Sequence, residues 1–202
     1  MSRLVLKSPE ELTPEQREQY QRISRFRKPG KDGAIGGPFD PWICSPELAK
    51  RAVSWGNFIW ERTTLDRRLV ELAILITARF WQSNVEWVSH SRMALENGVT
   101  QEIIDSVFAE RRPEKAREDE LLVYDVCRAL HETHQLPLNL YQGAVVSFGE
   151  RGLVEIIATI GYYTFVAMTL NAFEVGVPAG VKAPFPLQGK NTSRNVSGEK
   201  PR

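Results

Sequence analysis

The sequence predicts an all-α fold. Along most of its 202 residues, apolar side chains recur at helical spacing. Residues that cap or stop helices separate these stretches, and only short turns remain between them. No segment alternates polar and apolar residues convincingly, as a half-buried strand would. Helices joined by turns, with no sheet, are therefore expected.

The first part of the chain is expected to carry less helix than the rest. Residues 8–16 have a short helical pattern, and the basic, Gly-rich residues 28–37 are expected to form a loop. Ser45 can cap a helix in which Pro46 takes the first position, where its missing N–H costs nothing. The first long helix is therefore expected over 45–60.

The remaining helices follow in close succession. They are expected over 65–80, 82–97, 101–110, 113–133, 141–148 and 152–173. Capping residues at 63–66 open the first of these, Gly98 closes the second and Thr100 can cap the third. Pro113 opens the fourth, and a loop at Pro137 precedes the fifth.

Length and composition predict one domain. Residues 1–187 are expected to form it, with a core over about 45–178 and an N-terminal extension. The polar, Gly/Ser/Asn-rich residues 188–202 are expected to be a disordered tail. The formal net charge is only +1, and no dense block of Lys and Arg appears, so no nucleic-acid partner is expected.

The N-terminus and the cysteines predict a cytoplasmic protein. The first residues lack the apolar run of a secretory signal, and Cys44 and Cys127 lie far apart in the sequence. The apolar stretches 69–78 and 156–170 are too short or too interrupted to cross a bilayer. They are expected to be buried helices, and no membrane partner is expected.

Ionisable groups run through the apolar segment 71–90. Glu71 and Arg79 lie on one predicted helix, and Ser83, Glu86 and His90 lie at i, i+3 and i+7 on one face of the next. A buried charge is costly unless it is paired with another charge, with water or with a ligand. The segment is therefore a candidate site, in which Glu86 or Glu71 beside His90 would favour the protonated form of the imidazole. The alternative is a surface Glu86–His90 pair, with Arg79 paired to Glu71 inside.

The same segment resembles a known family. Residues 71–98, ending in His-Ser-Arg-Met-Ala-Leu-Glu-Asn-Gly, are similar to the carboxymuconolactone decarboxylase family, which includes the AhpD-type alkylhydroperoxidases. Residues 161–173 resemble the closing helix of that family, so that the resemblance covers most of 45–178. It implies an AhpD-like bundle of about seven to eight helices. It also implies a homo-oligomer, trimeric or hexameric, and a small acidic organic substrate.

The resemblance points to the non-redox branch of this family. The redox branch uses a Cys-x-x-Cys before its histidine, whereas Ser83 and Glu86 occupy those positions here. What remains implies a cofactor-free decarboxylase acting on a carboxylated lactone from aromatic ring cleavage. His90 would be the general acid/base, Glu86 would orient it or share its proton, and Arg79 would hold a substrate carboxylate.

Five further residues have weaker assignments. Glu71 is either a buried support for Arg79 or a direct participant. Trp42, in a Gly- and Pro-rich loop at 36–42, could cover the ligand or pack on the core. Tyr163 and Asn171 are expected to add polar contacts to the substrate, as is Ser83 from the face that it shares with Glu86 and His90.

Other functions stay open at this point. The same acid/base site would suit an isomerase or a lactone or ester hydrolase acting on a muconate-type acid, and a non-catalytic binding protein or a thiol peroxidase is also conceivable. His131 and His134 could be read as metal ligands, but histidines are also favoured near a helix C-terminus by the helix dipole. Without a clear third ligand, no metal and no cofactor are expected.

Overall fold

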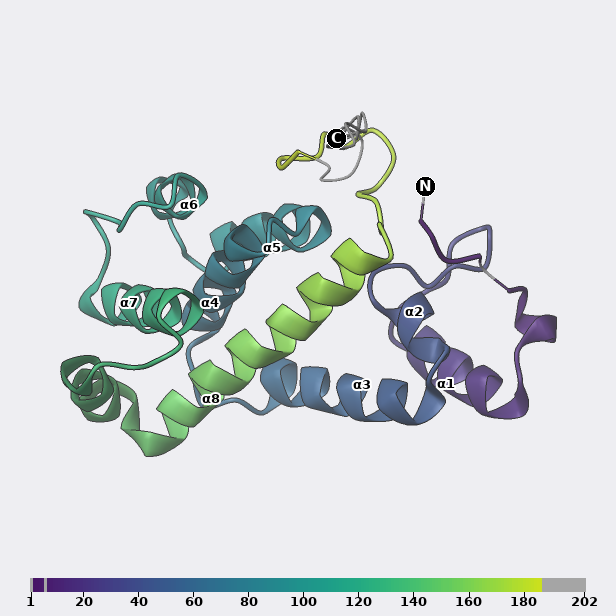
Figure 1. Cartoon of the computed structure of the whole chain (residues 1–202), viewed down its shortest axis with the longest axis horizontal. Coiled ribbons are helices and arrows are strands. Elements are labelled where there is room, and N and C mark those ends of the chain that lie inside the picture. Colours follow the sequence, from purple (N-terminus) through teal and green to yellow (C-terminus); the bar gives the residue numbers. More distant parts are fainter. Residues whose placement is uncertain (1, 6, 187–202) are drawn as a thin grey trace, which may run out of the picture.

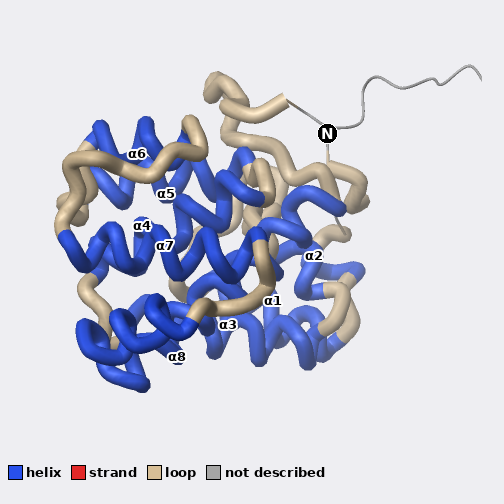
Figure 2. Tube along the Cα trace, turned by 60° about the vertical axis from the view of Figure 1, so that its left-hand side comes forward, coloured by secondary structure: helices blue, strands red, loops and turns tan. Residues whose placement is uncertain are grey.

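The computed structural model describes residues 2–5 and 7–186, and this part of the chain is all helical. Figure 2 shows helices and loops throughout, with no strand in the described residues, which confirms the predicted all-α class. The predicted tail at 188–202 lies outside the described residues. The elements are η1 (Pro9–Glu11), α1 (Pro14–Ser24), α2 (Phe39–Ile43), α3 (Pro46–Glu61), α4 (Arg67–Phe80), α5 (Asn84–Glu96), α6 (Gln101–Phe108), α7 (Glu118–Glu132) and α8 (Leu138–Ala172).

Helix α4 is the centre of the molecule. It packs against α5, α7 and α8, and every residue from 68 to 78 is buried. A helix that is apolar nearly all round is stable only when neighbours cover all of its faces. Its charged residue Glu71 is therefore held inside the bundle, where it needs a partner.

The predicted caps are partly right. Thr100 accepts a hydrogen bond from the backbone N–H of Ile103 and caps α6 as expected. At the start of α4 the cap is Asp66, whose carboxylate accepts from the N–H of Arg68 at 2.9 Å. The helix expected over 113–133 begins only at Glu118, because residues 113–117 form an irregular, bent segment before it.

Helix α8 crosses the molecule and contacts α3, α4 and α7 (Figure 1). Gly149, with φ 70° and ψ 168°, interrupts it and separates two helical segments, as the sequence predicted. By length and mean hydropathy of 1.6 the helix could cross a membrane, but 61% of that apolar window is buried within the described protein. Such burial is typical of a core helix.

The N-terminal part is more helical than predicted. Residues 14–24 form α1, well beyond the short pattern expected at 8–16. The segment expected to be a lid loop contains the short helix α2, with Trp42 buried in it. Figure 1 shows α1 and α2 at the same end of the molecule, beside α3.

Candidate functional site

Glu71 and His90 form the centre of a buried polar cluster. Nδ1 of His90, on α5, lies 2.7 Å from Oε2 of Glu71, on α4. The other carboxylate oxygen of Glu71 accepts a hydrogen bond from Arg67, one turn earlier on α4. Both the glutamate and the histidine are buried. The carboxylate therefore fixes the orientation of the imidazole and leaves Nε2 as the ring nitrogen that can face a ligand.

The electrostatics keep Glu71 ionised. Burial by itself would raise the pKa of this carboxyl group, because it disfavours the charged form. The hydrogen bond and charge of His90, together with the charge of Arg67, outweigh burial and lower the pKa of Glu71. In this triad the Glu71 carboxylate thus bridges the guanidinium of Arg67 and the imidazole of His90.

Two aromatic residues border this triad. The guanidinium of Arg67 stacks over the ring of Trp60, 3.5 Å from its centroid, and Trp60 is 46% exposed. Tyr163, on α8, meets the ring of His90 edge-on at 5.0 Å between centroids. Four helices therefore converge here: α3 at its end, α4, α5 and α8.

Ser83 and Glu86 lie buried at the start of α5. Ser83 is its N-cap residue and Glu86 lies in its first turn. In the described part of the chain, neither the hydroxyl of Ser83 nor either carboxyl oxygen of Glu86 has a hydrogen-bond partner of normal geometry. The expected pairing of Glu86 with His90 is therefore wrong, because Glu71 from the neighbouring helix occupies Nδ1 of the histidine.

Glu86 titrates unlike Glu71. Burial raises the pKa of Glu86 to about 8, and the nearby hydroxyl of Ser83 offsets only part of this effect. The site thus holds two buried carboxyl groups in opposite states at neutral pH, one ionised and one protonated. Pairs of this kind are typical of acid/base sites.

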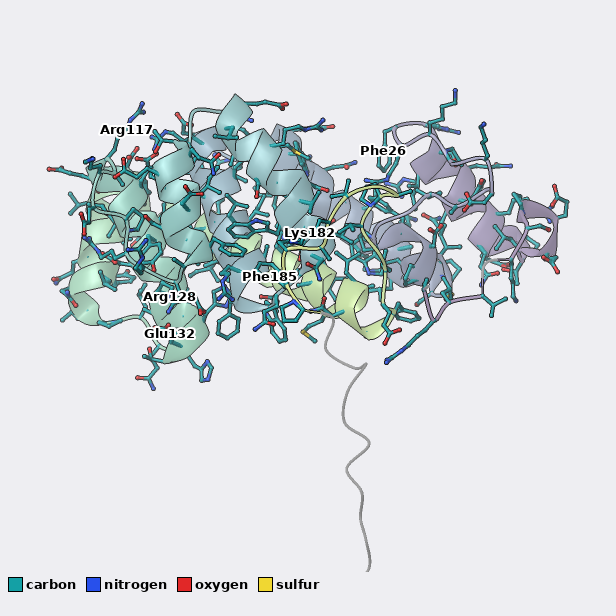
Figure 3. The ribbon with its side chains drawn as sticks, turned by 90° about the horizontal axis from the view of Figure 1, so that it is seen from above. Phe26, Arg117, Arg128, Glu132, Lys182 and Phe185 are labelled. Carbon is teal, nitrogen blue, oxygen red and sulfur yellow. The ribbon has the colours of Figure 1, made fainter. Side chains whose placement is uncertain are left out.

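Arg79 lies elsewhere, so its expected pairing with Glu71 is wrong. Its guanidinium donates to the backbone carbonyl of Phe108 at 2.7 Å and to Glu110 at 2.9 Å. It also lies over the ring of Phe185, on the C-terminal segment seen in Figure 3. The eight-residue step from position 71 to position 79 spans about 12 Å of helix, too far for a direct pair, whereas Arg67 is one turn away.

Two other expected ligand contacts are not brought to the triad. Trp42 stacks on Phe165 at 5.1 Å and donates its indole N–H to Thr169, so it packs α2 onto α8. Asn171 is exposed and donates to the backbone carbonyl of Trp81 at 2.8 Å. Of the residues assigned to substrate contacts, Tyr163 lies against His90, and Ser83 lies buried with Glu86 at the start of α5.

The remaining histidines and cysteines lie outside this cluster. His131 is buried, 3.1 Å from the hydroxyl of Thr77 and stacked on Phe80, whereas His134 is exposed. Cys127 is buried in the core and Cys44 is exposed after α2. Among the described residues, no three His, Cys, Asp or Glu side chains gather as a metal site would require.

The sequence reasoning missed Arg67 and Trp60. The signal for Arg67 was available, since it lies four residues before Glu71 on a predicted helix, where side chains meet. Trp60 carried no comparable signal. It ends a different helix, and only the turn between α3 and α4 brings it over the guanidinium.

Comparisons with known proteins concern the fold and part of the chain. Residues 46–122 match the carboxymuconolactone decarboxylase family. No curated protein matches the sequence. A solved structure of an Agrobacterium tumefaciens protein of unknown function, for which an AhpD antioxidant-defence role has been suggested, superposes with a TM-score of 0.62 at 17% identity, covering 70% of this chain and 98% of that one.

A second solved structure is similar over more of the chain. It is an uncharacterised peroxidase-related protein from Silicibacter sp. TM1040, with a TM-score of 0.69 at 11% identity, and it covers 88% of this chain and 92% of its own. At such low identity, both structures establish the fold and leave the chemistry to the site.

Proposed function

We propose that the protein is a cofactor-independent decarboxylase acting on a carboxymuconolactone-like product of aromatic ring cleavage. The match of residues 46–122 to the carboxymuconolactone decarboxylase family supports this proposal. The observation that carries this proposal is the buried 2.7 Å contact between His90 and Glu71. It supplies a positioned proton donor and acceptor, with Arg67 beside it as a cation.

The chemistry follows from what decarboxylation requires. As the bond to the carboxylate carbon breaks, its electron pair moves toward the conjugated carbonyl, and carbon dioxide leaves. The resulting enolate needs stabilisation, and its carbon then needs a proton. In the protonated state, Nε2 of His90 can deliver this proton, while Glu71 stabilises the imidazolium through Nδ1. His90 then regains a proton from solvent.

Arg67 takes over the substrate-binding role that the sequence assigned to Arg79. One nitrogen of its guanidinium is buried and, among the described residues, has no hydrogen-bond partner. A carboxylate is the natural acceptor for such a donor. The stack on Trp60 holds the guanidinium in place and offers a flat apolar surface beside it.

Ser83 and Glu86 stand where the redox branch of the family has its two cysteines, which supports acid/base rather than thiol chemistry. Ser83 and Glu86 cannot cycle through a disulfide. Burial raises the pKa of Cys127, which disfavours the reactive thiolate. We therefore expect no peroxide consumption above background with a dithiol donor.

The test is an assay of the purified protein against a panel of carboxymuconolactones and hydroxymuconate-type acids, with released carbon dioxide measured directly. We expect His90→Gln to lose at least about 100-fold in turnover, the usual scale of a general acid/base. His131→Gln, which changes a buried histidine outside the cluster, is the matched control. Full turnover by His90→Gln would refute the proposal, and product without carbon dioxide would indicate the isomerase or hydrolase instead.

A further inference from the structure

The first turn of α5 holds an unexplained group of buried polar atoms. Both carboxyl oxygens of Glu86 and the hydroxyl oxygen of Ser83 are buried and have no hydrogen-bond partner among the described residues. Glu86 is only 3% exposed and Ser83 is fully buried. Folded proteins satisfy the great majority of buried polar atoms. Ser83 and Glu86 are close enough to act on each other, but no other side chain serves them among the described residues, so this turn has hydrogen-bonding capacity left for a ligand.

Glu86 can occupy this place only as a neutral acid. An ionised carboxylate, buried without a cation or a donor, would strongly destabilise the folded protein. The groups of α8 that act electrostatically with it are the phenols Tyr162 and Tyr163, neither of which is a cation. At neutral pH the side chain is therefore a carboxylic acid with one O–H to donate.

Tyr163 connects this acid to the triad. Burial is the main cause that raises the pKa of the Tyr163 phenol, and the negative charges of Glu71 and Glu86 both add to it. The positive charge of Arg67 acts in the opposite direction. The same phenol also meets the ring of His90 edge-on at 5.0 Å between centroids. We therefore take the triad and the acid at the start of α5 as parts of one site.

We propose that Glu86, as a neutral carboxylic acid assisted by the Ser83 hydroxyl, is a catalytic residue that donates a hydrogen bond to the carbonyl oxygen of the substrate as that oxygen becomes an enolate. The inference rests on the proposed function and deepens it. The substrate class becomes an unsaturated acid with its carboxylate at Arg67 and a conjugated carbonyl oxygen at Glu86. Glu86 keeps its proton, and the proton added to carbon comes from His90.

This arrangement predicts a probe that binds without reacting. 4-Hydroxy-3-nitrobenzoate has a carboxylate and, when ionised, a coloured phenolate that imitates the enolate. We expect the wild-type protein to bind its phenolate form. The affinity should fall as the pH rises through about 8, where Glu86 loses the proton it donates.

Two substitutions separate hydrogen bonding from shape. Glu86→Gln keeps a neutral donor, so its affinity for the probe should stay within about tenfold of wild type and should not change near pH 8. Glu86→Leu has no donor, so its affinity at pH 7 should fall at least about tenfold, the scale of one hydrogen bond to a charged group. The matched control is His131→Gln, which should bind as wild type does. Equal binding by wild type and Glu86→Leu would overturn the proposal.

An infrared measurement on the wild-type protein covers the case in which a variant fails to fold. At pH 7, difference spectra should contain a carboxylic acid C=O band that shifts on ¹³C-glutamate labelling and disappears in Glu86→Gln. Its absence would overturn the proposal. If Glu86→Leu released carbon dioxide at the wild-type rate, the catalytic role of Glu86 would be refuted, whereas the decarboxylase function would stand. If the probe bound with the expected dependence on Glu86 but no lactone were turned over, hydrogen-bond donation by Glu86 would stand and the decarboxylase function would be refuted.

Discussion

Two arginines on α4 differ in what surrounds them. Arg67 pairs with Glu71, stacks on Trp60 and keeps one buried nitrogen without a partner in the described chain. Arg79 uses its donors on Phe108 and Glu110. The first has capacity left for a ligand, whereas the second joins α4 to the end of α6.

The first prediction compares these arginines. Arg67→Met should raise the KM for an acidic substrate by about 10- to 100-fold, because it removes a charge-assisted bond to the carboxylate. Arg67→Lys should recover part of this loss by restoring the charge. Arg79→Met should lower thermal stability and leave the KM unchanged. Steady-state kinetics of the three variants are the measurement, and a larger KM effect at Arg79 would contradict the assignment.

His131 provides a second prediction at this scale. Burial is the main cause that lowers the pKa of His131 to about 4, and the charge of Arg128 adds to it. Arg128 also pairs with Glu132 on the same helix (Figure 3). Between pH 6.5 and 4, His131 therefore binds a proton in the unfolded chain but stays neutral in the folded protein.

The stability contributed by neutral His131 is thus present above pH 6.5 and is lost as the pH falls toward 4. This group should lower the free energy of unfolding by up to about 3 kcal/mol across that window. His131→Gln should remove this slope, whereas the exposed control His134→Asn should keep it. Urea unfolding at a series of pH values would measure the difference. An unchanged slope in His131→Gln would show that other groups carry it.

At the scale of elements, a single glycine shapes α8. Gly149 has φ 70° and ψ 168°, a region closed to residues with a Cβ, and no atom lies close enough to obstruct one. The cost of a side chain there is therefore purely conformational. We expect Gly149→Ala to lower the free energy of unfolding by about 1–3 kcal/mol. Chemical denaturation would check this, with the half-exposed, helical Ala158→Gly as a comparison in the same element.

The limits of sequence prediction are also clearest in the elements. The long helices were predictable because their apolar spacing, Thr100, Gly98 and Gly149 are local signals. Helix α2 was not, because its helical form follows from the packing of Trp42 against Phe165, far along the chain. The site divides in the same way: the shared face of Glu86 and His90 follows from spacing, but the choice of Glu71 as the partner of His90 depends on how α4 and α5 meet.

At the scale of the whole molecule, one face remains apolar and uncovered. It combines exposed side chains of α3 and α8: Trp55, Val154, Ile157 and Met168. Trp55 lies over Gly161, so that the two helices form a continuous surface. Apolar patches of this kind are typical of interfaces between subunits.

The fourth prediction follows from that face. We expect a homo-oligomer, a trimer or a hexamer, at micromolar concentration, and Trp55→Glu should weaken it by placing a charge in an apolar interface. Sedimentation velocity would measure the assembly, and a single species at the chain mass of 23.0 kDa would contradict the expectation. Leu138→Glu, an exposed apolar position at the start of α8, is the control.

The chain uses one local pattern twice. Arg151 pairs with Glu155 on α8 just as Arg67 pairs with Glu71 on α4, and both glutamates are buried. Oε2 of Glu155, however, accepts hydrogen bonds from the hydroxyls of Thr63 and Thr64 and from the backbone N–H of Thr64, and so stabilises the turn that leads into α4. Selection should therefore treat the two positions differently. A substitution of Glu155 would be selected against in any descendant because it weakens folding. A substitution of Glu71 would also alter the acid/base site, and it could therefore give rise to a new reaction.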